Sequence, residues 1–405
     1  MDNIAGSPVE GSNFYGRDAV VEHLRQVLDN DDILLLGPRR IGKTSAARAI
    51  MAAVRRDDWQ AIEVNVARCV NEQDFLIKLK SELKPVLDTI TSKTKGAIID
   101  AFNATTKRIK SIKVGSIGVE LNGSQSEDWP IVACDLLHLI AQTEQRWLIY
   151  VDELPIMLFN IIRNDPQNGV QRVRRFLDWF RNDVRALPGS GKVRWLVSGS
   201  VGLDTLVQEH GMADTINSMS HQGLEAFSDE VAVAMLGELA ASYGMALSID
   251  DRRKMVAAVQ WPQPYYLQTA FNHLRVLRMA NVKANLPDLI EQAINKMVQP
   301  GADNDFHHWE MRLSLQLSRP DADHALALLN LVAQDSTGAR PENLLAALEE
   351  RMPNATPDEA RRTFIRLRDI LQRDAYWGAD GTTGTKRYRF RLEPLRRWWL
   401  RRNTL

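Results

Sequence analysis

Residues 37–44 read GPRRIGKT and directly follow a short apolar run at 33–36. Two glycines separated by four residues allow the backbone to wrap tightly, so that successive N–H groups point at the oxygens of a phosphate. A helix is predicted to begin near Gly42, and its positive dipole end would add to the attraction for an anion. A strand, a glycine loop and a helix in this order predict a phosphate-binding loop.

The side chains of this loop suit a triphosphate with a bound metal. Lys43 is expected to reach the β- and γ-phosphates, and Thr44 to place its hydroxyl on Mg²⁺. Arg39 and Arg40 fill variable positions, where contact with phosphate, contact with a neighbouring subunit and solvated charge all remain open. The loop residues predicted to bind nucleotide are Gly37, Pro38, Arg39, Arg40, Ile41, Gly42, Lys43, Thr44 and Ser45.

An acidic pair follows the strand predicted at 146–151, where residues 148–154 read LIYVDEL. Ligands of parallel sheets bind beyond the carboxyl ends of the strands. We therefore expect Asp152 to hold Mg²⁺, through water, together with Thr44. Glu153 is placed to orient or deprotonate an attacking water, so Glu153 and Lys43 are the predicted catalytic residues. The phosphate loop and the acidic pair are expected to meet at adjacent strand ends.

Two serines, Ser198 and Ser200, follow the strand predicted at 194–198 in the segment LVSGSVGL. A polar side chain at that strand end could contact the γ-phosphate. Serine also caps turns frequently, so a purely structural role accounts for Ser198 equally well.

The pattern of apolar residues predicts an α/β core followed by helices. Strands at 33–36, 61–66, 146–151 and 194–198 alternate with predicted helices, which favours a parallel sheet with helices on both faces. Alternating apolar and polar residues around two glycines predict a β-hairpin insertion near 109–121. From residue 228 the strand signal fades, and helices are predicted at 229–243, 250–259, 265–279 and 286–298.

Composition excludes several classes of protein. The formal net charge is zero, so any binding to nucleic acid or to an anionic membrane requires a local patch. The two cysteines form no CxxC pair, which excludes a cysteine-rich zinc site and fits a reducing cytoplasm, the expected location. The most apolar long stretch, 147–162, contains Asp152 and Glu153, which argues against a membrane span.

An ordered set of segments over roughly residues 13–300 resembles the archaeal-type P-loop ATPases of the STAND clade. These are AAA+-like ATPases related to origin-recognition proteins. The segments are NFYGRDAVVEHLRQVL, GPRRIGKTS, YVDELP, VRWLVSGSVGL, GLEAFSDEVAVAML and WPQPYYLQ.

The resemblance implies a P-loop NTPase core, a helical lid, ATP and Mg²⁺ as cofactors, and ATPase activity. It implies that Tyr15 and Arg17, in the N-terminal motif, lie beside the nucleotide base, and that Pro264 faces the nucleotide from the lid. The sequence departs from the family at 261–263, where Trp-Pro-Gln replaces the usual glycines.

The C-terminal region has the outline of a winged helix, a domain that the same family commonly carries. Helices are predicted at 325–332, 341–352 and 356–373, followed by two strands around a Gly-rich turn. A basic helix with a basic wing could lie along duplex DNA, although winged helices also serve as protein-docking modules. The candidate DNA-contacting residues are Arg361, Arg362, Arg366, Lys386, Arg387 and Arg389.

The leading functional hypothesis is an ATP-driven switch whose nucleotide state controls self-association or engagement of a separate effector protein. Members of this clade act in signalling or in defence against foreign genetic elements. The alternatives are a DNA-binding ATPase of the replication-initiator or transposition-regulator type, and a module that holds nucleotide without turnover. The predicted regions are a flexible tail at 1–13, a P-loop ATPase core at 14–227, a helical lid at 228–300, a linker at 301–319 and a winged-helix-like domain at 320–405.

Overall fold

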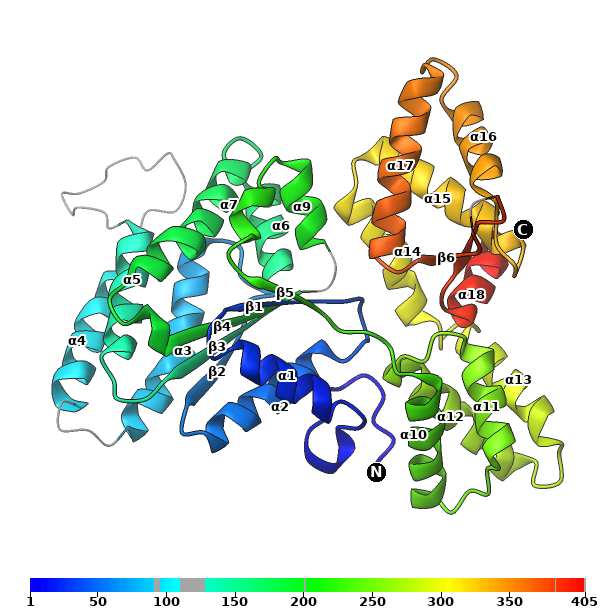
Figure 1. Ribbon diagram of the computed structural model, residues 1–405, viewed down its shortest axis with the longest axis horizontal. Helices are drawn as coiled ribbons and strands as arrows, with labels where there is room; N and C mark the ends of the chain where they lie inside the picture. The colour runs from blue at the N-terminus through cyan, green and yellow to red at the C-terminus, as the bar shows by residue number, and fades with distance from the viewer. Residues whose placement is uncertain (91–94, 110–127, 200–201, 383, 404–405) are drawn as a thin grey trace. The chain divides into compact units, whose positions relative to one another are not determined.

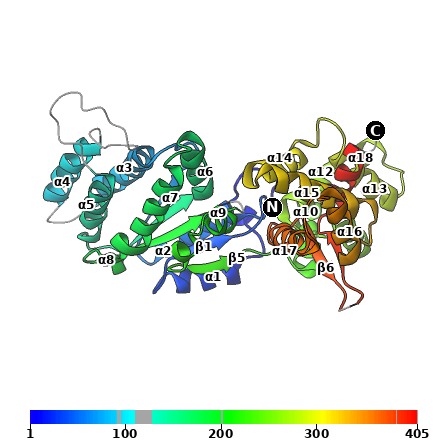
Figure 2. The same ribbon diagram turned by 90° about the horizontal axis from the view of Figure 1, so that it is seen from above.

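The structure is a computed structural model that describes residues 1–90, 95–109, 128–199, 202–382 and 384–403 (Figures 1 and 2). The chain divides into two compact units. We call one the sheet unit; it consists of Arg17–Gly37 and Lys43–Leu224. We call the other the helical unit; it consists of Met1–Gly16, Pro38–Gly42 and Glu225–Leu405.

Within the described residues, the sheet unit contains a five-stranded parallel sheet with the strand order β2-β3-β4-β1-β5. Every residue of β3 is buried, as expected for a strand that is covered on both faces. The sequence analysis missed β5, because its residues, SHQG, carry no apolar or β-branched signal. The strands are β1 (Ile33–Leu36), β2 (Gln60–Asn65), β3 (Trp147–Asp152), β4 (Val193–Ser198) and β5 (Ser220–Gly223).

Helices cover both faces of this sheet, which confirms the predicted α/β fold. In Figure 1, α1 and α2 lie on one side of the strands, and α6, α7 and α9 lie on the other. A π-helical turn at Trp179–Asp183 lies between α7 and α8. The helices are α1 (Asp18–Val27), α2 (Lys43–Arg56), α3 (Glu72–Thr89), α4 (Lys95–Arg108), α5 (Trp129–Ala141), α6 (Leu154–Asn164), α7 (Gly169–Asp178), α8 (Val184–Ala186) and α9 (Leu203–Glu209).

The core of the sheet unit is rich in aromatic side chains. The rings of Phe180 and Trp195 meet edge to face with their centroids 4.6 Å apart, and those of Trp129 and Trp179 do so at 5.2 Å. Such pairs add about 1 kcal/mol each to the free energy gained by burial. The β-hairpin predicted near 109–121 lies, beyond Ile109, outside the described residues.

The helical unit contains the lid helices predicted from the sequence and the C-terminal region. Residues 301–319, which we expected to be a linker, contain α14 and the beginning of α15. The helix buries Phe306, Trp309 and Leu313 at helical spacing. The helices are α10 (Asp229–Ser242), α11 (Ile249–Val259), α12 (Pro264–Ala280), α13 (Leu286–Met297), α14 (Asn304–Gln316), α15 (Arg319–Gln334), α16 (Pro341–Arg351), α17 (Pro357–Arg373) and α18 (Glu393–Asn403).

The C-terminal region has elements that are compatible with the predicted winged-helix-like domain. The helices α15, α16 and α17 precede an antiparallel pair of strands, β6 (Trp377–Asp380) and β7 (Arg387–Phe390). A capping box at Thr356 and Glu359 fixes the start of α17. A further helix, α18, follows the strands.

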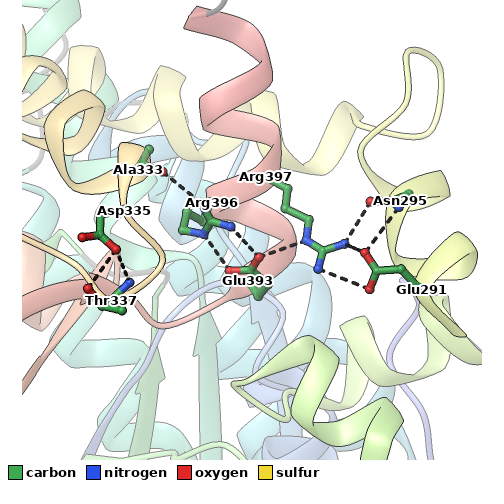
Figure 3. Close-up of polar contacts among 8 residues, drawn as sticks. All are labelled: Glu291, Asn295, Ala333, Asp335, Thr337, Glu393, Arg396 and Arg397. Atoms are coloured by element: carbon green, nitrogen blue, oxygen red, sulfur yellow. Dashed lines mark hydrogen bonds and ion pairs between the residues drawn. The ribbon is translucent and has the colours of Figure 1, made fainter. Parts of the chain in front are cut away.

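Charged side chains bind α18 to the lid helix α13 and to α15 (Figure 3). Arg397 forms an ion pair with Glu291 of α13 at 2.5 Å and donates a hydrogen bond to Asn295 at 2.9 Å. Arg396 donates to the backbone oxygen of Ala333 at 3.0 Å. Both arginines also bind the carboxylate of Glu393. The lid helices and the C-terminal domain are therefore held together within one unit.

The N-terminal residues, expected to be a flexible tail, make hydrogen bonds within the helical unit. The amino group of Met1 donates to Ser242 at 3.0 Å, and the backbone N–H of Asn3 donates to the hydroxyl of Tyr243 at 3.1 Å. The side-chain amide of Asn3 donates to the backbone oxygen of Gln268 at 3.2 Å. In the described part of the chain, no helix combines the length and hydropathy needed to cross a membrane.

Candidate nucleotide-binding site

Three strands of the sheet unit bring predicted site residues to the carboxyl edge of the sheet. Gly37 follows β1, Ser198 ends β4, and Asp152 ends β3. Our expectation that the phosphate loop and the acidic pair lie at adjacent strand ends was wrong, because β4 separates β1 from β3. Ser198 therefore lies between the two predicted halves of the site.

The phosphate loop has the backbone that its glycines predict. Gly37 and Gly42 have φ angles of 151° and 99°, which side-chain-bearing residues rarely adopt. The helix α2 begins at Lys43, whose ammonium donates a 2.8 Å hydrogen bond to the backbone oxygen of Gly37. Lys43 is buried, with only 8% of its surface exposed. Its charge is thus held at the loop, where phosphate oxygens would be stronger acceptors than a carbonyl.

Thr44 and Asp152 meet in the sheet unit although they lie 108 positions apart in sequence. The hydroxyl of Thr44 donates to Asp152 Oδ2 at 3.3 Å, and that of Ser198 donates to Asp152 Oδ1 at 2.6 Å. The aspartate is 6% exposed, and both of these donors are neutral hydroxyls. A carboxylate and a hydroxyl are hard oxygen ligands, which suit Mg²⁺ with its remaining positions filled by water and phosphate.

The donor set fits magnesium better than a transition metal. Within the described residues there is no cluster of three or more His, Cys, Asp or Glu side chains that could form an all-protein cage. Mg²⁺ dehydrates reluctantly and commonly binds through one or two protein ligands plus phosphate oxygens. Thr44 and Asp152 would therefore hold the metal together with the nucleotide.

Tyr150 belongs to this cluster and was missed by the sequence analysis. Its hydroxyl lies 3.0 Å from Ser198 Oγ. Because Ser198 gives its only proton to Asp152, the tyrosine hydroxyl must donate to Ser198. Burial, followed by the charge of Asp152, raises the pKa of Tyr150, so the phenol keeps that proton. Alternation along a strand places Tyr150 on the face of Asp152, a signal that could have been used.

Glu153 follows Asp152 in an unusual backbone conformation. Its φ of 61° is left-handed, and it precedes the first turn of α6, where Pro155 follows. Non-glycine residues in this region are uncommon and cluster at functional sites, which motivates a functional hypothesis for Glu153. The structure keeps this side chain half-buried beside the end of β3.

The loop after β4 approaches α6 so closely that only glycine fits there. A Cβ atom at Gly199 would lie 2.3 Å from both Cγ and Cδ of Pro155. We expect Gly199→Ala to lower the free energy of unfolding of the sheet unit by about 2 kcal/mol, in the range of overpacked sites. Urea unfolding measures the change. The control is Gly191→Ala, whose Cβ would meet nothing within 4 Å; equal stability of the two variants would contradict the close approach.

The remaining predicted residues divide between the two units. Arg17 is buried in the sheet unit, and Ser45 is buried in the first turn of α2. Tyr15 packs against the core of the helical unit, and Pro264 begins α12 in that unit. The loop residues assigned to the helical unit are Pro38, Arg39, Arg40, Ile41 and Gly42. Ser200 lies outside the described residues.

No protein-family model and no curated protein matches the chain. A Walker-type ATPase of Pyrococcus abyssi is similar over 98% of this chain and 99% of its own length, with 13% sequence identity and a TM-score of 0.64. The ORC2 protein of Aeropyrum pernix, solved as ADPNP-ADP complexes, is similar over 96% and 95%, with 14% identity and a TM-score of 0.56. This chain therefore has the fold of the Walker-type P-loop ATPases, from its phosphate loop to its C-terminal helices.

Proposed function

We propose that the chain is a Mg²⁺-dependent ATPase that acts as a nucleotide-controlled switch of the STAND or AAA+-like type. The contact between Thr44 and Asp152 carries this proposal. It joins the end of the phosphate loop to the acid of a separate strand, with Lys43 held at the same loop. A hydroxyl, a carboxylate and an ammonium in this arrangement form the protein side of a triphosphate–magnesium site.

The residues at the carboxyl edge of the sheet have different roles in the proposed hydrolysis. The N–H groups at the start of α2 and the ammonium of Lys43 would bind the phosphates, and Thr44 with Asp152 would hold Mg²⁺. The bound metal would neutralise charge on the phosphate oxygens. Glu153 orients and deprotonates the attacking water. Ser198, held by Tyr150, fixes the carboxylate of Asp152 and sits where it could contact the γ-phosphate.

The helical unit supports the switch part of the proposal. Through α13, α15 and α18, its charged network ties the lid helices to the C-terminal domain, so a change in the lid would be passed to that domain. ATP would then favour self-association or contact with a separate effector protein. By its resemblance to the STAND clade, the chain would serve signalling or defence against foreign genetic elements in the cytoplasm.

A second candidate is a DNA-binding ATPase of the replication-initiator or transposition-regulator type. Arg361 and Arg362 favour it, because both are exposed on α17 of the winged-helix-like region. The other basic candidates are already engaged: Arg366 pairs with Asp321, Arg389 with Asp380, Arg387 donates to Gly338, and Lys386 lies over the ring of Tyr388. The two ion pairs lower the positive charge available to phosphates. Gel shifts at several salt concentrations test it, since phosphate contacts make affinity fall steeply with salt.

Replacing Lys43 by alanine tests the nucleotide site directly. The variant loses charge-assisted bonds to the phosphates, so we expect its Kd for MgATP to rise by about a factor of 30. Isothermal titration calorimetry measures the change. The matched control is Lys192→Ala, which removes another lysine that donates to a backbone oxygen in the sheet unit, that of Thr143 at 2.9 Å. Equal affinities of the two variants would refute the proposal.

A further inference from the structure

Arg40 lies in the middle of the phosphate loop in a backbone conformation that arginine seldom adopts. Its φ of 67° is left-handed, although the residue has a side chain. Such a conformation is costly and persists only where surrounding groups hold it in place. The loop's own glycines do not explain it, so the groups that bind the Arg40 side chain must be considered.

Three segments of the helical unit hold the guanidinium group of Arg40. One nitrogen forms an ion pair with Asp305 at 2.5 Å, and another donates to the backbone oxygen of Gly6 at 3.1 Å. The guanidinium carbon lies 4.4 Å from the centre of the Tyr265 ring, a cation–π distance. The hydroxyl of Tyr265 donates to the second carboxylate oxygen of Asp305. Arg40, Tyr265 and Asp305 therefore form a closed set, which we call the arginine clamp.

Buried aromatic side chains hold together the two helices that carry Tyr265 and Asp305. Tyr265 and Asp305 lie in the first turns of α12 and α14. The residues that follow them, Tyr266 and Phe306, are buried and stack with their ring centroids 5.8 Å apart and their planes 6° apart. Trp309 of α14 also donates to the hydroxyl of Tyr266 at 3.0 Å. The two helices are thus fixed to each other next to the clamp.

The surroundings of the arginine clamp favour the ion pair between Arg40 and Asp305. Asp305 lies in the first turn of α14, where the helix dipole favours a negative carboxylate. The side chains of Arg40 and Asp305 are only 24% and 19% exposed, so water screens their attraction less than at a free surface. The planar guanidinium can bind the carboxylate and stack on the ring at once, which a lysine could not do.

We propose that Tyr265 and Asp305 are positioning residues for the phosphate loop: by holding Arg40, they keep the loop in the conformation that accepts a triphosphate. A loop already ordered before binding loses less conformational freedom when the ligand arrives, so its affinity is higher. The inference rests on the proposed binding of nucleotide by this loop. It adds that two helices distant in the sequence, α12 and α14, set the affinity; Asp305 of α14 lies 265 positions after Arg40.

Substitutions of Tyr265 and Asp305, the two helix residues of the arginine clamp, test this proposal. Asp305→Asn keeps the shape of the side chain and removes its charge, and Tyr265→Phe keeps the ring and removes the hydroxyl. We expect the Kd for MgATP to rise about tenfold in Asp305→Asn and about threefold in Tyr265→Phe, measured by calorimetry. Without nucleotide, amide hydrogen exchange at residues 37–45 should be faster in both variants, because the loop opens more often.

A double-mutant cycle separates the clamp from a general loss of packing. Arg40→Ala should weaken binding, and adding Asp305→Asn to it should change the Kd no further, because the partner is already gone. The control is Asp321→Asn, which removes another ion pair of the helical unit, with Arg366. It should leave both the Kd and the exchange of residues 37–45 unchanged.

The outcomes distinguish failure of the clamp from failure of the proposed function. Wild-type affinity in Asp305→Asn, or equal effects of Asp305→Asn with and without Arg40, would overturn the clamp. If wild type and Lys43→Ala bind MgATP equally, the proposed nucleotide site fails instead. The exchange measurement without nucleotide then still decides whether Asp305 and Tyr265 order the loop, since unchanged exchange would overturn that role.

Discussion

Replacing Glu153 by glutamine should reduce ATP turnover at least about a hundredfold while the Kd for MgATP stays within a factor of about two. The amide keeps the size of the side chain but cannot accept the proton of the attacking water. Binding should survive, because we propose that the phosphate and metal contacts come from Lys43, Thr44 and Asp152. Single-turnover phosphate release, measured beside calorimetric titration, separates the two quantities.

The matched control is Glu144→Gln, an exposed carboxylate of the same unit that precedes the opposite end of β3. It should leave turnover unchanged. Phosphate release in Glu153→Gln at the wild-type rate would show that Glu153 is not the base. Equal losses of affinity and turnover would instead assign it to nucleotide binding.

The candidate site residues that could be predicted from the sequence are those that depend only on neighbouring residues in the chain. The strand–loop–helix sequence at 33–44 predicted the loop, and an apolar strand ending in Asp152 predicted the metal acid. Both depend on residues within one element and its next turn. In the structure, the hydroxyl of Thr44 joins them by donating a hydrogen bond to Asp152.

What the sequence could not predict depends on which strands and helices become neighbours. Strand order is a non-local property, so the position of β4 between β1 and β3 was missed, and with it the role of Tyr150 behind Ser198. The partner of Arg40, Asp305, lies 265 positions away in a segment that we expected to be a linker. The Pro-Gly pair at 300–301 indicated a break in the helical pattern. The polar residues at buried positions of α14, Arg312 and Gln316, interrupted the apolar periodicity that would have predicted this helix.

The charged network around α18 leads to the largest stability effect that we expect. Glu393 is 8% exposed in its side chain, and its carboxylate accepts two 2.7 Å hydrogen bonds from Arg396 and one of 2.9 Å from Arg397 (Figure 3). Glu393→Gln leaves two partly buried guanidinium groups without this partner. Breaking a buried pair in this way costs about 3 kcal/mol of unfolding free energy. Urea unfolding measures the loss of unfolding free energy, and amide hydrogen exchange measures the effect on α18.

An ion pair on the same helix provides the matched control. Arg402 pairs with Glu310 at 2.8 Å, but its side chain is 43% exposed. Exposed pairs contribute less because water and salt screen them. We therefore expect Glu310→Gln to cost less than about 1 kcal/mol. Equal effects of Glu310→Gln and Glu393→Gln would contradict the special role of the buried network.

The pH dependence of this difference identifies its electrostatic origin. Burial alone would raise the pKa of Glu393, but the hydrogen bonds from Arg396 and Arg397 outweigh it and hold the pKa below its usual value. The folded state thus favours the ionised form. Its contribution to stability is fully present above the unfolded pKa of about 4.3 and is lost as the pH falls through the lower folded pKa. The stability gap between wild type and Glu393→Gln should be constant from about pH 7 to about pH 5 and shrink below about pH 4. A gap that persists undiminished in acid would mean that packing, not charge, holds α18 to α13 and α15.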